Sequence, residues 1–282
     1  MFIWDCHYVI ILNTVCVATL PHTYIFVKIF IITYSEKKIN RFLNFKLIYR
    51  VIMGIFITLE GIDGSGKTTA LKLLCSDLAK DGYRVLQTKE PTETLLGKFI
   101  RNTVLGTGGD ASFMKSMDIK TSALAALFLF SADRTAHVDE IIAKLDSFDI
   151  IICDRFIDST YAYQTANSDD AEGTRDLKEF ILTINEFILN RRSFNIARTY
   201  LLDLEPKVAL SRLSGRVHGF DGFDGRSPDF FNAVREGYLY LSVRHKDRIK
   251  IIDASGPSEN IVMEILKDLK GLVDEKIAST NE

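Results

Sequence analysis

The sequence predicts an α/β fold in which a doubly wound, five-stranded parallel sheet is flanked by helices. Apolar runs of strand length alternate with segments of helical periodicity from residue 53 onward. A glycine-rich loop joins the first of these strands to the first of these helices. Polar residues follow directly after two more of the strands, where open α/β sheets bind ligands. With 282 residues, 47% of them apolar, the chain can bury the core that this fold needs.

The first strand, predicted at Ile55–Glu60, leads through the sequence GIDGSGKT into a helix predicted at Lys67–Asp81. This loop has the form GxxxxGK[ST], which binds phosphate when a strand precedes it and a helix follows. Its glycines let backbone N–H groups converge on phosphate oxygens, and the helix N-terminus adds a positive dipole end. Lys67 would reach the β- and γ-phosphates, and the Thr68 hydroxyl would face Mg²⁺. We therefore expect a P-loop NTPase fold that binds a nucleoside triphosphate.

Further strands and helices alternate along the rest of the chain. The strands are predicted at Arg84–Thr88, Asp149–Cys153, Thr199–Asp203 and Ile249–Asp253. The helices are predicted at Leu95–Leu105, Lys120–Leu145, Glu172–Asn190, Lys207–Leu213, Ser227–His245 and Ser258–Val273. The loop Gly215–Arg226 carries four glycines between two helices. Near a triphosphate site such a loop favours a mobile lid over a solvated connection.

Charge and cysteine content limit the partners and the compartment. The formal net charge of −2 predicts no nucleic-acid partner. The four cysteines form no CxxC pair, so we expect a reduced, cytoplasmic location. The five histidines have no metal-site or triad spacing, and we assign them no role.

Residues 1–52 differ from the remainder, which we divide into a domain at 53–275 and a tail at 276–282. Two apolar runs, Tyr8–Leu20 and Tyr24–Tyr34, are each shorter than the ~20 residues that span a bilayer. Three interpretations stay open for this extension. Translation starts at Met53 and the segment is not part of the working protein; the segment contacts a membrane, which is the less favoured alternative; or it forms an extra packed element.

Three further stretches carry chemistry. An apolar strand ends in Asp154, like the Mg²⁺-facing acid of P-loop enzymes, and the Arg155 guanidinium that follows suits a phosphate. The stretch Thr88–Thr92 ends the second strand, and Phe130–Arg134 lies in a long helix. Taken alone, Phe130 would be a core residue, and Asp133 with Arg134 a solvated helix face.

The stretches GIDGSGKTT, TKEP, LFSADR and DRFIDSTYAYQ, in this order and at these strand ends, resemble the thymidylate kinase family over about residues 54–270. The resemblance implies transfer of the γ-phosphoryl group from ATP to dTMP, with Mg²⁺, in dTDP biosynthesis. It also implies a homodimer, for which the apolar helix segment Ser122–Phe130 offers a surface.

The resemblance assigns roles to individual residues. Asp63 would lie near the acceptor phosphate and metal, with Asp154 and Thr68 at the metal. The acid of the TKEP stretch would close on the catalytic centre, Phe130 would stack on thymine, and Arg134 would contact the base edge. The ATP phosphates would lie on Gly61, Ile62, Asp63, Gly64, Ser65, Gly66, Lys67, Thr68 and Thr69. The acceptor would lie on Glu90, Pro91, Phe130, Arg134, Arg155, Ser159, Thr160, Tyr163 and Gln164.

The catalytic cations are the least regular part of the resemblance. One variety of the family carries an arginine inside the phosphate loop, and this chain has none there. We therefore expect Arg216 and Arg226 of the lid to act with Asp63, Lys67 and Arg155 on the transferred group. Departures include Lys89 in place of arginine before Glu90, and Phe156 where tyrosine or histidine is common. Alternatives are another P-loop nucleotide or deoxynucleoside kinase, and a non-catalytic ATP-binding switch protein.

Overall fold

The computed structural model describes residues 9–12, 15–18, 54–105, 123–166, 171–215 and 227–280. The chain divides into two compact units, Met1–Arg50 and Val51–Glu282. Within the first unit, β1 (Val9–Leu12) and β2 (Val15–Ala18) form an antiparallel pair, with Val9 opposite Ala18. The remainder of the predicted extension lies outside the described residues, and so does Met53, the predicted first residue of the domain.

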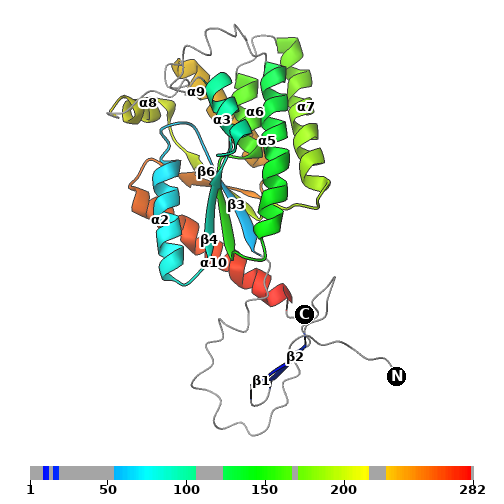
Figure 1. The fold of residues 1–282 in the computed structure, drawn as a ribbon. Helices are drawn as coiled ribbons and strands as arrows, with labels where there is room; N and C mark the ends of the chain where they lie inside the picture. Colours follow the sequence, from blue (N-terminus) through cyan, green and yellow to red (C-terminus); the bar gives the residue numbers. More distant parts are fainter. Residues whose placement is uncertain are drawn as a thin grey trace. The chain divides into compact units, whose positions relative to one another are not determined.

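The second unit is built on a five-stranded sheet with the order β4-β5-β3-β6-β7, in which every pair is parallel (Figure 1). The strands are β3 (Ile55–Glu60), β4 (Val85–Lys89), β5 (Ile150–Asp154), β6 (Arg198–Asp203) and β7 (Ile249–Asp253). The predicted doubly wound parallel sheet is therefore confirmed. From β3 the chain passes over the position of β5 to form β4, returns to form β5 beside β3, and then forms β6 on the other side of β3. The strand β3 and its following loop therefore lie at the centre of the sheet.

Helices join consecutive strands and cover the sheet in the part of the chain that the structure describes (Figure 1). They are α2 (Lys67–Lys80), α3 (Leu95–Thr103), α5 (Ala123–Lys144), α6 (Ile157–Ala166), α7 (Ala171–Asn190), α8 (Pro206–Ser214), α9 (Pro228–Arg244) and α10 (Ser258–Thr280). None of them is long and apolar enough to cross a membrane. The last helix continues beyond its predicted end at Val273 to Thr280.

The core lies on both faces of β3, because successive side chains of a strand point to opposite sides. Ile55, Ile57 and Leu59 join a cluster with the buried leucines of α2, whereas Phe56 packs with residues of α5 and α7. All six residues of β3 are buried. Such a strand, buried on both faces, is typical of the centre of a parallel sheet.

The sequence prediction has no helix after Arg155, whereas the structure has α6 there. The apolar side chains of α6 form no single stripe, because the helix is buried on several sides by neighbouring helices. Buried Thr160, Tyr161 and Gln164 therefore look irregular when they are read as a pattern. Because α6 starts two residues after Arg155, it carries the acceptor-side residues on a rigid element.

Candidate active site

The loop between β3 and α2 has the backbone that its glycines permit. Gly66 caps α2 with φ of 95°, and Gly64 has φ of 81°, both in the left-handed region. A Cβ at Gly64 would lie 2.6 Å from the carbonyl oxygen of Ala209, so the loop packs directly on the backbone of α8. Because α2 begins at Lys67, its N-terminal N–H groups and dipole are available to an anion at this loop.

Lys67 lies over the loop, where its Nζ donates to the carbonyl oxygens of Gly61 at 3.0 Å and Ile62 at 2.9 Å. Burial, and after it the neighbouring Arg155, lower the pKa of Lys67, while Asp63 opposes them, and the resulting pKa is about 8. An anionic ligand at the loop would favour the charged ammonium and raise this pKa again. The side chain is thus held where it can reach a bound phosphate.

Thr68 and Asp154 meet at the carboxyl ends of β3 and β5. The Thr68 hydroxyl donates to Asp154 Oδ2 at 3.3 Å. Asp154 Oδ1 is buried and has no hydrogen-bond partner within the residues described. A buried carboxylate oxygen without a donor is costly unless a cation or water satisfies it. Hydroxyl and carboxylate oxygens are ligands that Mg²⁺ accepts, so this pair fits the metal expected from the sequence.

Arg155 lies directly after β5 and has φ of 67°, a conformation unusual for a residue with a side chain. Its Nη2 donates to Asp63, in a short ion pair, and to the Tyr163 hydroxyl at 3.1 Å. The Tyr163 hydroxyl in turn donates to Asp63 Oδ2 at 2.9 Å, and the guanidinium carbon lies 4.9 Å from the Tyr163 ring centroid. Burial raises the pKa of Asp63, but Arg155 and Lys67 outweigh it and hold that pKa below its ordinary value.

Glu60 is a buried carboxylate behind Arg155 that the sequence analysis did not assign. It accepts hydrogen bonds from the Ser159 hydroxyl at 2.6 Å and the Tyr238 hydroxyl at 3.0 Å. Burial, and after it Asp158, raise the pKa of Glu60, while Ser159 and Arg155 oppose the increase, and the resulting pKa is about 7.

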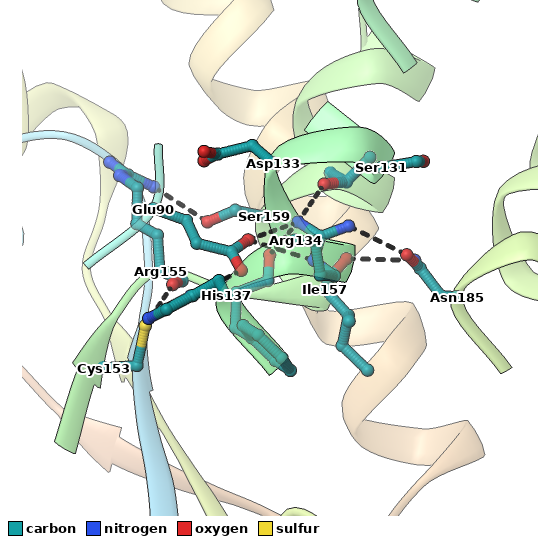
Figure 2. A network of polar contacts seen from close by, with 12 residues as sticks. Glu90, Ser131, Asp133, Arg134, His137, Cys153, Arg155, Ile157, Ser159 and Asn185 are labelled. Carbon is teal, nitrogen blue, oxygen red and sulfur yellow. Dashed lines mark hydrogen bonds and ion pairs between the residues drawn. The ribbon is translucent and has the colours of Figure 1, made fainter. Parts of the chain in front are cut away.

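A second buried network surrounds Arg134 of α5, which Figure 2 shows between Glu90 and Asn185. Arg134 Nε and Nη2 both donate to Glu90 Oε2, at 3.0 and 2.7 Å, and Nη1 donates to Asn185 at 2.9 Å. Nη2 also donates to the Thr160 hydroxyl at 2.8 Å. Arg134 is 2% exposed, so its interpretation as part of a solvated helix face is wrong.

His137 lies one turn along α5 from Arg134 and contacts the other carboxylate oxygen of Glu90. Its Nδ1 lies 3.0 Å from Glu90 Oε1, and its Nε2 lies 2.7 Å from the Thr88 hydroxyl. Asp133 of the same helix accepts from the Thr92 N–H at 2.8 Å and is equally buried, so it too is no solvated residue. The stretch after β4 is therefore fixed to α5 by side chains at both ends.

A cavity of about 430 Å³ connects the two regions. A volume of this size accommodates a small-molecule substrate. Predicted site residues line it from both sides: Asp63, Gly64, Gly66, Lys67, Thr68, Thr69, Glu90, Pro91, Phe130, Arg134, Asp154, Arg155, Ser159, Thr160, Tyr163 and Gln164. Gly61, Ile62 and Ser65 are buried beneath the loop instead of lining this space. Arg216 and Arg226, with the predicted lid, lie outside the described residues.

Two residues near the site, Tyr161 and Arg212, have their partners away from the cavity. Tyr161 stacks on Tyr240, with ring centroids 5.6 Å apart, so of the two neighbouring tyrosines it is Tyr161 that packs and Tyr163 that faces the cavity. Arg212 donates to the carbonyl oxygens of Ala254 and Ser255, both at 3.1 Å, and Glu205 pairs with Arg235.

The sequence analysis assigned no role to several residues that lie in or beside the site. Glu60 directly precedes the phosphate loop, and an acid at the end of a buried strand is itself an unusual choice that could have marked it. His137, Asn185 and Tyr238 lie far from the loop along the chain. Arg101 also lines the cavity, where its guanidinium contacts the Pro91 carbonyl oxygen and Glu93.

A family model described as thymidylate kinase matches residues 59–265. The chain is 40% identical over 219 residues to a thymidylate kinase of Onion yellows phytoplasma, which covers 77% of this chain and 97% of that protein. It is 38% identical over 228 residues to a probable thymidylate kinase of Thermococcus gammatolerans, with 80% and 99% covered. It is 36% identical over 222 residues to a thymidylate kinase of Desulforapulum autotrophicum, with 76% and 90% covered.

Proposed function

The chain belongs to the thymidylate kinase family, and on this premise we propose that it transfers the γ-phosphoryl group of ATP to dTMP. One observation carries the proposal: a single cavity joins the phosphate loop to the arginines Arg155 and Arg134. An oxygen of the dTMP phosphate attacks the γ-phosphorus, and the bond from that phosphorus to the ADP oxygen breaks. The products are dTDP and ADP.

The residues near the loop suit a phosphate acceptor. A monophosphate needs a cation to reduce charge repulsion with ATP, whereas a nucleoside hydroxyl needs a base that removes its proton. Arg155 would supply that cation, with Asp63 and Tyr163 fixing its guanidinium. Lys67 would hold the donor phosphates, and its charge would stabilise the oxygens of the transferred group.

Thr68 and Asp154 would hold Mg²⁺ together with the donor phosphates, since one Asp154 oxygen is buried without a donor in the part of the chain that the structure describes. When bound, the ion neutralises charge on the phosphate oxygens. Arg216 and Arg226 are proposed to add positive charge from the lid during transfer.

The acceptor base would lie at the other end of the cavity. Phe130 would form a flat apolar platform, and Arg134 would present a fixed donor to the base edge. Glu90 would act by holding Arg134, from which it accepts two hydrogen bonds. Pro91, Ser159, Thr160 and Gln164 would surround the sugar and base, with Tyr163 beside the deoxyribose.

We further propose a homodimer, formed through exposed apolar side chains on adjacent helices. Leu124 and Phe128 of α5 are 47% and 51% exposed, and Phe187 of α7 is 67% exposed. An apolar surface of this kind marks an interaction site. Sedimentation should show a dimer that the double substitution of Phe128 and Leu124 by lysine converts to a monomer. The reduced thiols of Cys75 and Cys153 support a cytoplasmic location, which fractionation of cells would test.

The function is tested by following ADP formation from ATP and Mg²⁺ with separate acceptors: dTMP, dUMP, ribothymidine monophosphate, dCMP and thymidine. We expect dTMP to be preferred and Arg155→Ala to lower turnover by ~10³, as loss of a transition-state arginine does. Preference for thymidine would identify a nucleoside kinase. ATP binding without turnover of any acceptor would favour the switch-protein alternative.

The role of residues 1–52 needs its own measurement. Both regions of the site lie within residues 54–280, so we expect a chain that begins at Met53 to keep its turnover within about twofold. A loss of turnover or of folding in the shortened chain would instead favour the packed-element interpretation. Flotation of the full chain with anionic vesicles would support the membrane alternative.

A further inference from the structure

Glu60 ends the central strand and is enclosed by three elements. Its side chain is 0% exposed, and its Oε1 accepts from the Phe156 N–H at 2.7 Å and the Ser159 N–H at 3.4 Å. Its Oε2 accepts from the Ser159 hydroxyl of α6 and the Tyr238 hydroxyl of α9. Two of these four hydrogen bonds come from side-chain hydroxyls, and a fully buried acid needs an explanation beyond packing, because burying a carboxylate is costly.

The same two hydroxyls contact Arg155 from the opposite side. Arg155 Nη1 lies 3.2 Å from Ser159 Oγ and 3.3 Å from the Tyr238 hydroxyl, and these two oxygens are 2.8 Å apart. A guanidinium can only donate, and an ionised carboxylate can only accept. Each hydroxyl has one proton, and only Glu60 and the other hydroxyl can accept it, so at least one proton of the pair points to Glu60 and both oxygens keep lone pairs for Arg155.

We propose that Glu60 is a positioning residue for the acceptor phosphate, which orients the Ser159 and Tyr238 hydroxyls so that they hold the guanidinium of Arg155. This inference rests on the proposed function, in which Arg155 binds the phosphate of dTMP. It gives Tyr238 a role as well, as one of two hydroxyl links between the carboxylate and the cation. Arg155 is then held on one side by Asp63 and on the other by a neutral pair that Glu60 polarises.

Glu60→Gln would reverse this arrangement with little change in shape. The amide oxygen must face the Phe156 and Ser159 N–H groups, so the amide NH₂ takes the position of Oε2. The NH₂ then donates to the hydroxyls, one of which can still donate to the other, and the remaining hydroxyl proton turns toward Arg155. A donor facing a donor repels, so Arg155 would lose at least one of its two hydroxyl supports.

The experiment measures the affinities of the full-length protein for dTMP and for ATP separately, by titration calorimetry at pH 8, where Glu60 is mostly ionised. We expect Glu60→Gln to weaken dTMP binding about tenfold and Tyr238→Phe about threefold, with ATP affinity within twofold, as loss of one or two hydrogen-bond supports does. In an Arg155→Ala background, adding Glu60→Gln should cause no further loss of dTMP affinity. If Glu60 had only a structural role, its substitution would weaken dTMP binding with or without Arg155, and the two effects would add.

A matched control is Asp268 of α10, which likewise accepts from a tyrosine hydroxyl, that of Tyr200 at 3.0 Å, and lines no part of the cavity. Asp268→Asn should leave dTMP affinity unchanged. The inference is overturned if Glu60→Gln leaves a folded protein with unchanged dTMP affinity, lowers ATP affinity equally, or still weakens dTMP binding without Arg155. If Glu60→Gln does not fold, the same test is made with Tyr238→Phe, whose effect on dTMP affinity should likewise disappear in the Arg155→Ala background. Failure of the unaltered protein to bind dTMP would instead refute the proposed function.

Discussion

The two ends of the cavity are built in different ways. At the donor end, one uninterrupted stretch from Gly61 to Thr68 supplies the loop, its lysine and its hydroxyl. At the acceptor end, side chains from β4, α5, α6 and α7 meet in buried networks, with Arg134 bonded to four partners. A backbone site tolerates change around it, because its geometry is local. A side-chain network depends on every member, because each lost partner leaves a buried group unsatisfied.

The largest expected effect tests the donor end. Lys67→Ala should lower turnover by ~10³ while dTMP affinity in the absence of ATP changes little, because the lysine acts on the donor phosphates. Steady-state kinetics and calorimetry separate the two effects. Lys72→Ala, an exposed lysine on the same helix, is the matched control and should retain full turnover. Equal loss of dTMP affinity in the Lys67 variant would show that the two ends are not separable.

The acceptor end should respond in stability as well as in binding. Arg134→Met leaves Glu90 as a buried charge without its arginine, which should cost about 3 kcal/mol of unfolding free energy. Urea unfolding measures this cost, and the double variant with Glu90→Gln should recover part of it, since the uncompensated charge is then gone. Unfolding free energy unchanged by Arg134→Met would contradict a network that depends on each member.

The pH dependence of stability tests the burial of the Glu60 carboxylate by itself. In the folded protein the pKa of Glu60 is about 7, above its ordinary 4.5, so between these values the folded state binds more protons than the unfolded state. Stability should therefore fall as pH rises through that window, by on the order of 3 kcal/mol at most. Glutamine at this position does not ionise. The melting temperature of Glu60→Gln, measured relative to that of the unaltered protein, should therefore increase between pH 5 and pH 8. A constant difference across that range would show that the carboxylate is not strained by burial.

A smaller effect is expected at the metal ligands. Thr68→Ala should raise the Mg²⁺ concentration needed for half-maximal turnover by about tenfold, because one oxygen ligand is lost while Asp154 remains. Thr68→Ser keeps the hydroxyl and is the control. An unchanged Mg²⁺ requirement in Thr68→Ala would place the metal elsewhere.

The contrast between the two ends also explains what the sequence could predict. The order of strands and helices and the phosphate loop follow from contiguous patterns, and they are confirmed in the structure. Helix α6 was not predicted, because a helix buried on several sides has no apolar stripe. Arg134 and Asp133 are surface-type residues by composition, and only their partners on other elements explain their burial. The links from Glu60 through Tyr238 to Arg155 join residues 178 positions apart at the most, which no local pattern reveals.

The close approach of Gly64 to Ala209 restricts how this loop can evolve. No side chain at position 64 fits unless α8 moves, so a sequence that placed an arginine there would need a compensating change in α8. At Gly66 no neighbouring atom lies within 4 Å, because this residue lines the cavity where the donor phosphates are proposed to bind. Position 66 is therefore restricted by its backbone angle and by the ligand, whereas position 64 is restricted by the fold and would open only through paired changes in two parts of the gene.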